Sequence, residues 1–392
     1  MSDQACTHPA WLTADACDIE SFIAEVNQTT QPADYPYADH IEHNVPIYDG
    51  PQLAERIVDP DTARDIQAEW VQAMRFGPGI VVFKQAFAAE TIDQTTRAFD
   101  ETLAQQKANN VASGDHFAKP GANDRLWRAQ QKLAEHAPDT YAAYYANPLL
   151  AAVCEAWLGP MYQMTSDLNI VNPGGEAQNP HRDYHLGFMP SETAQRFPAH
   201  AHELSPMLTL QGAVAHCDMP IESGPTLYLP YSQRYLRGFL GIQYDVFREY
   251  FANHYVQLPL NKGDAVFFSP ALFHGAGHNI SRDIYRSANL LQVSSAFGRA
   301  LGTMNRTRLC RALYPTLQTL QQAGHTADVQ RVIAASAEGY GFPTNLDRDQ
   351  PIGGISPETQ AELVTRALSE GLPYETFVDQ LEAQAQRQRV DD

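Results

Sequence analysis

The residues best suited to chemistry in this sequence lie in the segment PHRDYH, at positions 180–185. His181 and Asp183 are two residues apart, so on an extended chain their side chains point to the same side. One imidazole and one carboxylate on the same side can bind a single metal ion. The segment therefore predicts two of the protein ligands of a metal site.

A third ligand is expected from the segment FFSPALFHGAG, at positions 267–277. There an apolar β pattern ends in a turn that presents His274 beside two glycines. The long separation from Asp183 allows the chain to leave a sheet and return on a neighbouring strand. Two histidines and one carboxylate form the facial triad of non-haem Fe(II) oxygenases, which leaves metal positions open for a cosubstrate and dioxygen.

Arg286 lies in a further β pattern, YRSANLL, at positions 285–291. A guanidinium on a core strand near a metal needs an anionic partner, because burying the charge alone is very costly. The distal carboxylate of 2-oxoglutarate, held in a bidentate fork, would be such a partner. The sequence thus predicts Fe(II), 2-oxoglutarate and O2 as cofactors.

The elements that position these residues are short β patterns between Gly, Pro and Asn turns, which run from residue 161 to about 297. This spacing is typical of an antiparallel sandwich or jelly roll. Helical patterns precede and follow it. We predict a mainly β core with flanking helices, a double-stranded β-helix (jelly roll, cupin-like). Its parts are an N-terminal arm and helix at 1–75, the jelly-roll domain at 76–297 and a C-terminal helical extension at 298–392.

Composition narrows the partners and the compartment. The chain has 27 Lys and Arg against 46 Asp and Glu, a net charge of −19, which argues against a nucleic-acid or anionic-membrane partner. No apolar run reaches the length of a transmembrane helix, and the N-terminus lacks a secretory signal pattern. The five cysteines are scattered without CxxC spacing, so we expect reduced thiols and a cytoplasmic protein. We interpret His216 and Cys217 as part of a packed strand.

Several segments together resemble the phytanoyl-CoA dioxygenase family of Fe(II)/2-oxoglutarate oxygenases. The resemblance covers roughly residues 75–297 and leaves the arm and the helical tail unexplained. In the family's Gly-Pro-x-x-x-x-Pro-Gly-Ser-His segment, Tyr231 and Gln233 here replace the second Gly and the His. The matching segments are HRDYH (181–185), ESGPTLYLPYSQR (222–234), NKGDAVFFSPALFHGAGHNIS (261–281) and RSANLLQ (286–292).

The resemblance implies a role for each matching residue. His181, Asp183 and His274 would ligate iron. Arg286 would bind the distal carboxylate of 2-oxoglutarate. The segment SDLNI resembles a strand of ectoine hydroxylases whose Asn contacts the cosubstrate, which nominates Asn169; the alternative is an Asn that satisfies neighbouring backbone.

Residues near the triad are candidates for contact with a small-molecule substrate. Arg182 lies between two ligands and on an ideal strand points to the opposite face, so an ion-pairing role is an equal alternative. Tyr184 and His185 follow directly, and for His185 we expect a role beside the ligands or against the substrate, with a structural histidine as the alternative. Trp127 lies in a region that often closes over the site in the family; a core position is the alternative.

The resemblance implies hydroxylation of an unactivated C–H bond of a small organic substrate, with release of succinate and CO2. Desaturation and ring formation stay open. Asp183 favours these outcomes over halogenation, because related halogenases have a small residue in its place. The alternative of another class is a non-catalytic or 2-oxoglutarate-independent metal-binding jelly roll, which would not require Arg286. We do not expect a CoA ester as substrate, since no basic cluster is evident. We expect the C-terminal helices to form a lid or a homodimer surface; the alternative is that they only extend the core.

Overall fold

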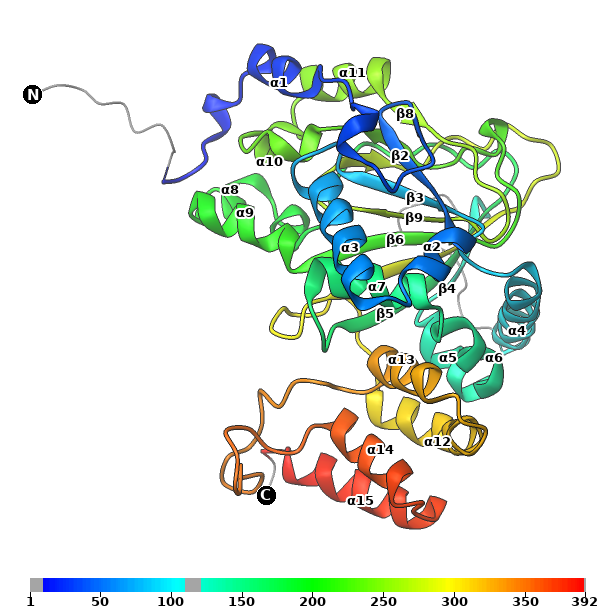
Figure 1. The fold of residues 1–392 in the computed structure, drawn as a ribbon. Helices are drawn as coiled ribbons and strands as arrows, with labels where there is room; N and C mark the ends of the chain where they lie inside the picture. Colours follow the sequence, from blue (N-terminus) through cyan, green and yellow to red (C-terminus); the bar gives the residue numbers. More distant parts are fainter. Residues whose placement is uncertain (1–9, 110–120, 391–392) are drawn as a thin grey trace, which may run out of the picture.

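The computed structural model describes residues 10–109 and 121–390, which form two β-sheets flanked by helices (Figure 1). The larger sheet has the strand order β1-β2-β3-β9-β6-β11-β5-β4. Adjacent strands of this sheet are antiparallel except β2 and β3, which are parallel, so the sheet is mixed. The strands are β1 His40–Glu42, β2 Val45–Asp49, β3 Ile80–Lys84, β4 Asn123–Leu126, β5 Gln163–Val171, β6 Thr209–Ala215, β9 Ala265–Phe268 and β11 Arg286–Ser294.

The smaller sheet is antiparallel and has the order β10-β7-β8. It packs on the larger sheet through apolar side chains of both: the ring of Tyr228 meets that of Phe268 edge-on at 5.2 Å between centroids. The predicted β core with flanking helices is confirmed at this level. The strands are β7 Leu227–Leu229, β8 Val256–Gln257 and β10 Phe273–Gly275.

The two faces of the larger sheet have different partners, because side chains alternate along each strand. Val82 and Phe268 belong to the core between the sheets. Val81, Phe83 and Phe267 face the opposite way, into the largest apolar cluster, which helices cover. These helices are α3 Pro60–Arg75, α4 Ala89–Ala108, α5 Ala129–His136, α6 Pro138–Tyr145, α7 Pro148–Leu158, α12 Arg306–Gln322, α13 Thr326–Ser336, α14 Gln360–Ser369 and α15 Tyr374–Arg387.

Among the shorter helices, α1 and α11 pack against the smaller sheet, whereas α2 joins the large apolar cluster through Leu53. Phe22 packs between Tyr235, Phe247 and Phe273, and so ties the N-terminal region to β10. None of the helices in the described part of the chain is long and apolar enough to cross a membrane. The remaining helices are α1 Ile19–Val26, α2 Gly50–Arg56, α8 Ser191–Ala194, α9 Ala199–Met207, α10 Gly238–Gly241 and α11 Asp245–His254.

The region predicted as an N-terminal arm is more than an arm, since it supplies two strands of the larger sheet. β1 and β2 form its edge beside β3. Val45 and Ile47 on β2 enter the core between the sheets, whereas Tyr48 faces the helices. β2 has a partner strand on each side, and a proline such as Pro46 in a run of this kind argues against a strand, so the sequence did not reveal β2.

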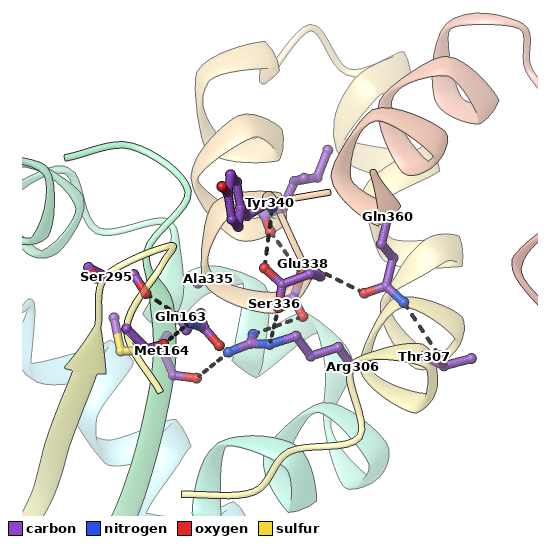
Figure 2. Close-up of polar contacts among 12 residues, drawn as sticks. Gln163, Met164, Ser295, Arg306, Thr307, Ala335, Ser336, Glu338, Tyr340 and Gln360 are labelled. Atoms are coloured by element: carbon purple, nitrogen blue, oxygen red, sulfur yellow. Dashed lines mark hydrogen bonds and ion pairs between the residues drawn. The ribbon is translucent and has the colours of Figure 1, made fainter. Parts of the chain in front are cut away.

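The C-terminal helices are attached to the β core through Arg306 at the start of α12 (Figure 2). Its guanidinium donates to the carbonyl of Met164 on β5 and to that of Ser336 at the end of α13, both at 3.3 Å. It also lies 3.8 Å from the carboxylate of Glu338. The backbone N–H of Glu338 in turn donates to Gln360 on α14 at 3.0 Å. One side chain thus links the sheet to both halves of the extension.

Arg306→Met is expected to lower the free energy of unfolding by about 2 kcal/mol, because it leaves buried carbonyls without a charged donor. Arg308→Met on the same helix is the matched control. The Arg308 side chain is 61% exposed and that of Arg306 only 10%. The control is expected to cost less than about 1 kcal/mol, as exposed ion pairs do. Urea unfolding of both variants tests this, and equal losses would contradict it.

His216, which follows β6, is a packed histidine, as interpreted from the sequence. Its Nδ1 lies 2.8 Å from Thr96 Oγ1 on α4 and its Nε2 lies 3.2 Å from the hydroxyl of Tyr144 on α6. Burial lowers the pKa of His216 from its usual 6.5 to about 3. The folded protein therefore keeps this ring neutral where the unfolded chain protonates it.

Because of His216, the free energy of unfolding should decrease as the pH is lowered. Between pH 6.5 and about 3 the unfolded chain binds one more proton here, so stability is fully present above 6.5 and declines as pH falls. The expected loss is about 1.4 kcal/mol per pH unit. Urea unfolding at pH 7.5 and 5.5 should show a smaller decline in His216→Gln. His254→Gln, which removes an exposed histidine, should keep the wild-type decline; equal slopes in all three proteins would contradict the assignment.

Candidate metal centre

Backbone pairing brings the three predicted ligands together. His181 and His274 form an antiparallel bridge, with N–H to carbonyl distances of 2.9 and 3.3 Å, beside the smaller sheet. The N–H of Asp183 donates to the carbonyl of Pro270 at 3.0 Å. Ligand atoms of all three side chains lie within 4.8 Å of one another. No other group of three or more His, Cys, Asp or Glu residues in 10–109 and 121–390 has such an arrangement.

Hydrogen bonds fix which nitrogen of each imidazole faces the centre. Nδ1 of His181 lies 3.0 Å from the carbonyl of Asn179, and Nδ1 of His274 lies 2.8 Å from that of Leu272. A carbonyl only accepts, so each Nδ1 carries a proton, and Nε2 is the nitrogen that faces the centre and could bind a metal. Burial, and the neighbouring His274, lower the pKa of His181, which favours the neutral form that binds metals.

The carboxylate of Asp183 lies between the two Nε2 atoms. Oδ1 is 3.6 Å from Nε2 of His181 and Oδ2 is 3.7 Å from Nε2 of His274. Burial alone would raise the pKa of Asp183, but hydrogen bonding and charge from the two histidines, with a hydrogen bond from Gln211, hold it below its usual range. A carboxylate set between two imidazole nitrogens is a ligand set that fits a cation, and three ligands leave further metal positions open.

A cavity of about 970 Å³ adjoins the triad, and all three ligands line it. Arg286 lines the same cavity from the start of β11 and is only 6% exposed. Its Nη1 is buried with no hydrogen-bond partner within the described residues. Burial lowers the pKa of Arg286 to about 10, so the guanidinium still carries its charge at neutral pH. A buried cation that faces a cavity without an acidic partner fits an anionic ligand.

The family model described as phytanoyl-CoA dioxygenase (PhyH) matches residues 77–288, more than half of the 392-residue chain. The chain belongs to this family. As a phytanoyl-CoA dioxygenase family member with a complete His-Asp-His site, it is a non-haem iron enzyme whose cofactors are Fe(II), 2-oxoglutarate and O2.

Solved structures similar to this family member include the epimerase SnoN and the carbocyclase SnoK, both non-heme, alpha-ketoglutarate-dependent and from nogalamycin biosynthesis. SnoN is 21% identical, with 61% of this chain and 85% of SnoN covered and a TM-score of 0.42. SnoK is 19% identical, with 57% and 83% covered and a TM-score of 0.41. SnoN with Fe3+, alpha-ketoglutarate and nogalamycin RO is also similar, at a TM-score of 0.39. No curated protein matches the sequence.

Asn169 and Trp127, nominated from the resemblance, both line the cavity of this family member. Asn169 on β5 lies opposite Ala288 on β11, and its Oδ1 is 3.4 Å from Nδ2 of Asn123. The guanidinium of Arg125 lies over the ring of Trp127, 4.1 Å from its centroid, in a cation–π contact. Their roles toward cosubstrate and substrate stay predictions.

Arg182 touches the cavity, but its guanidinium is directed elsewhere. The charge lies 4.4 Å from the ring centroids of both Phe239 and Phe273, and Nη2 donates to the carbonyl of Ser232 at 2.8 Å. Burial lowers its pKa to about 9. The alternation expected of a strand thus places the Arg182 head opposite the ligands, and the structure gives no support to a substrate contact by this group.

Tyr184 and His185 are not placed as predicted, because neither lines the cavity. Tyr184 is 1% exposed and packs edge-on against Phe239 at 5.0 Å. His185 Nε2 lies 2.6 Å from the carbonyl of Arg299, in the segment before α12. Alternation along the extended chain already turns Tyr184 away from the side of Asp183, and the 3-10 turn at His185–Phe188 then redirects His185. Phe188, at the end of the turn, lines the cavity instead.

Leu301 and Gln211 are two of the cavity residues that the sequence did not indicate. Leu301 comes from the segment between β11 and α12, beyond the family match, so the C-terminal part of the chain contributes to the cavity wall. Gln211 on β6 lies against Asp183. The sequence could have indicated Gln211, because it is an amide side chain at a core position of the apolar β pattern MLTLQGAV. The position of Leu301 in the cavity wall could not be predicted, because no sequence pattern indicates where a loop folds back onto the core.

Proposed function

We propose that this enzyme hydroxylates an unactivated C–H bond of a small organic substrate. One oxygen atom of O2 enters the C–H bond, and the other enters succinate as 2-oxoglutarate loses CO2, so the substrate R–H leaves as R–OH. The observation that carries the proposal is the intact carboxylate ligand, Asp183, beside two histidines in one cavity with Arg286, whose Nη1 has no hydrogen-bond partner among the described residues.

Each residue has a distinct task in this proposal. His181, Asp183 and His274 hold the metal, and Arg286 anchors the distal carboxylate of the cosubstrate through its buried guanidinium. Bound iron with 2-oxoglutarate and O2 supplies the two-electron oxidant that the protein side chains lack. The cavity walls orient the substrate and exclude water.

Three further parts of the proposal concern architecture and partners. We assign the two packed sheets to a double-stranded β-helix. The substrate is a small molecule rather than a CoA ester, as the acidic charge of the chain favours. A homodimer through the C-terminal helices and a cytoplasmic location complete the proposal.

The test starts with the iron-loaded enzyme, 2-oxoglutarate and a panel of amino-acid derivatives, lipids, secondary metabolites and CoA esters. A substrate should stimulate succinate formation and gain 16 mass units, with the added oxygen traced to labelled O2. A mass loss of 2 would replace hydroxylation by desaturation or ring formation. Turnover of CoA esters alone would overturn the small-molecule assignment. No succinate with any compound, although iron binds, would favour a non-catalytic metal-binding pocket.

A further inference from the structure

Gln211 is the polar group that lies closest to the metal-binding carboxylate. It is located on β6, opposite Phe268 of β9 and Gln292 of β11. Its side chain is buried, lines the cavity, and donates from Nε2 to Oδ2 of Asp183 at 2.5 Å. The two imidazoles are more than 1 Å farther from the carboxylate, at 3.6 and 3.7 Å.

The backbone of Asp183 is not part of a regular strand, so a side-chain contact can add to the positioning of its carboxylate. It lies outside any strand, in the chain between the bridge at His181 and the 3-10 turn. One backbone hydrogen bond, to Pro270, holds it. A carboxylate in such a place can rotate, whereas a rigid strand can hold one of its oxygens through a side-chain amide.

The other atom of the amide gives a second, independent observation. Oε1 of Gln211 is buried and has no hydrogen-bond partner among the described residues. An apolar side chain of similar length would avoid that unsatisfied acceptor, so fold stability alone does not account for a glutamine here. What the amide contributes is its N–H toward Asp183.

We propose that Gln211 is a positioning residue of the iron site, which holds Oδ2 of Asp183 so that Oδ1 is presented to the metal. A neutral donor suits this task, because a lysine or arginine would neutralise the anion that Fe(II) needs. The inference rests on the iron site described above and concerns a contact outside the metal ligands themselves.

Gln211→Met tests the proposal, since it keeps the length of the side chain and removes the donor. Gln292→Met is the matched control: Gln292 lies opposite Gln211, lines the same cavity and is not hydrogen-bonded to Asp183 within the described chain. Anaerobic titration with Fe(II) should show 10- to 100-fold weaker binding in Gln211→Met, roughly the effect of losing a partner of a metal ligand. The visible charge-transfer band with 2-oxoglutarate should also shift.

A merely structural role predicts a different result, namely a lower melting temperature of the apo-protein. We expect the melting temperature of Gln211→Met to stay near that of wild type, because the mutation removes an unsatisfied acceptor and a hydrogen bond to Asp183 together, and these two effects oppose each other. Gln211→Leu repeats both measurements with a second apolar side chain. Wild-type Fe(II) affinity and an unshifted band in the Gln211 variants, or an equal loss in Gln292→Met, would overturn the inference. A wild-type protein without any band would reject the iron and 2-oxoglutarate site itself.

Discussion

Replacing Asp183 with alanine is expected to abolish succinate formation and to weaken Fe(II) binding by more than about 100-fold. Partners of metal ligands already contribute about 10- to 100-fold, so the loss of a ligand should exceed that range. Asp183 is also the single carboxylate of the triad, and hydrogen bonds and charge from its neighbours hold its pKa below its usual range. Anaerobic Fe(II) titration and detection of succinate by mass spectrometry measure both effects.

Asp167→Ala is the matched control for this prediction. Asp167 lines the same cavity from β5 but pairs with Arg125 at 3.5 Å and takes no part in the triad. Fe(II) affinity in this variant should stay within about twofold of wild type, since sites that share no partner behave independently. Wild-type Fe(II) affinity in Asp183→Ala would refute the assignment of the triad.

The metal ligands were predictable because their geometry is mostly local. Alternation along an extended chain places His181 and Asp183 on one side, and this requires no knowledge of the tertiary structure. His274 was identified as the end of an apolar β pattern beside glycines. Its pairing with His181 is long-range, and the sequence allowed that contact without specifying it.

Prediction failed where the chain departed from the regular strand assumed for it. Tyr184 and His185 were nominated because they follow Asp183 directly, but Tyr184 packs against Phe239 and a 3-10 turn begins at His185. The turn packs closely: a side chain on Gly187 would collide with the carbonyl of Arg182. A pattern of apolar and polar residues does not reveal such a contact between a turn and the chain that precedes it.

The C-terminal helices were recognised as helices, yet their packing was not predictable. Leu313, Val332 and Leu363 belong to the same apolar cluster as the helices that cover the larger sheet. Amphipathic periodicity predicts that a helix has a buried face but not which partner covers it. The anchoring role of Arg306 was likewise hidden, because an arginine at a helix start is usually exposed.

Removal of the Arg286 guanidinium should produce the second large effect, this time on the cosubstrate. In Arg286→Met, 2-oxoglutarate affinity is expected to fall by about 30-fold to several thousandfold, since truncating one member of a buried charge pair costs about 2–5 kcal/mol. Fe(II) affinity without 2-oxoglutarate should be unchanged, because Arg286 is not a metal ligand. Anaerobic titration, followed by the charge-transfer band, separates the two affinities.

Arg286→Met should lower the affinity for 2-oxoglutarate without lowering the stability of the apo-protein. Arg286 is buried with Nη1 unsatisfied within the described chain, so methionine should leave the melting temperature of the apo-protein unchanged or raise it. Arg286→Lys keeps the charge but loses the planar fork and should bind 2-oxoglutarate with intermediate affinity. Arg125→Met, which alters another arginine of the cavity, should leave 2-oxoglutarate affinity within about twofold of wild type. If Arg286→Met binds 2-oxoglutarate as wild type does, the cosubstrate is anchored elsewhere, and the buried guanidinium must serve the substrate instead.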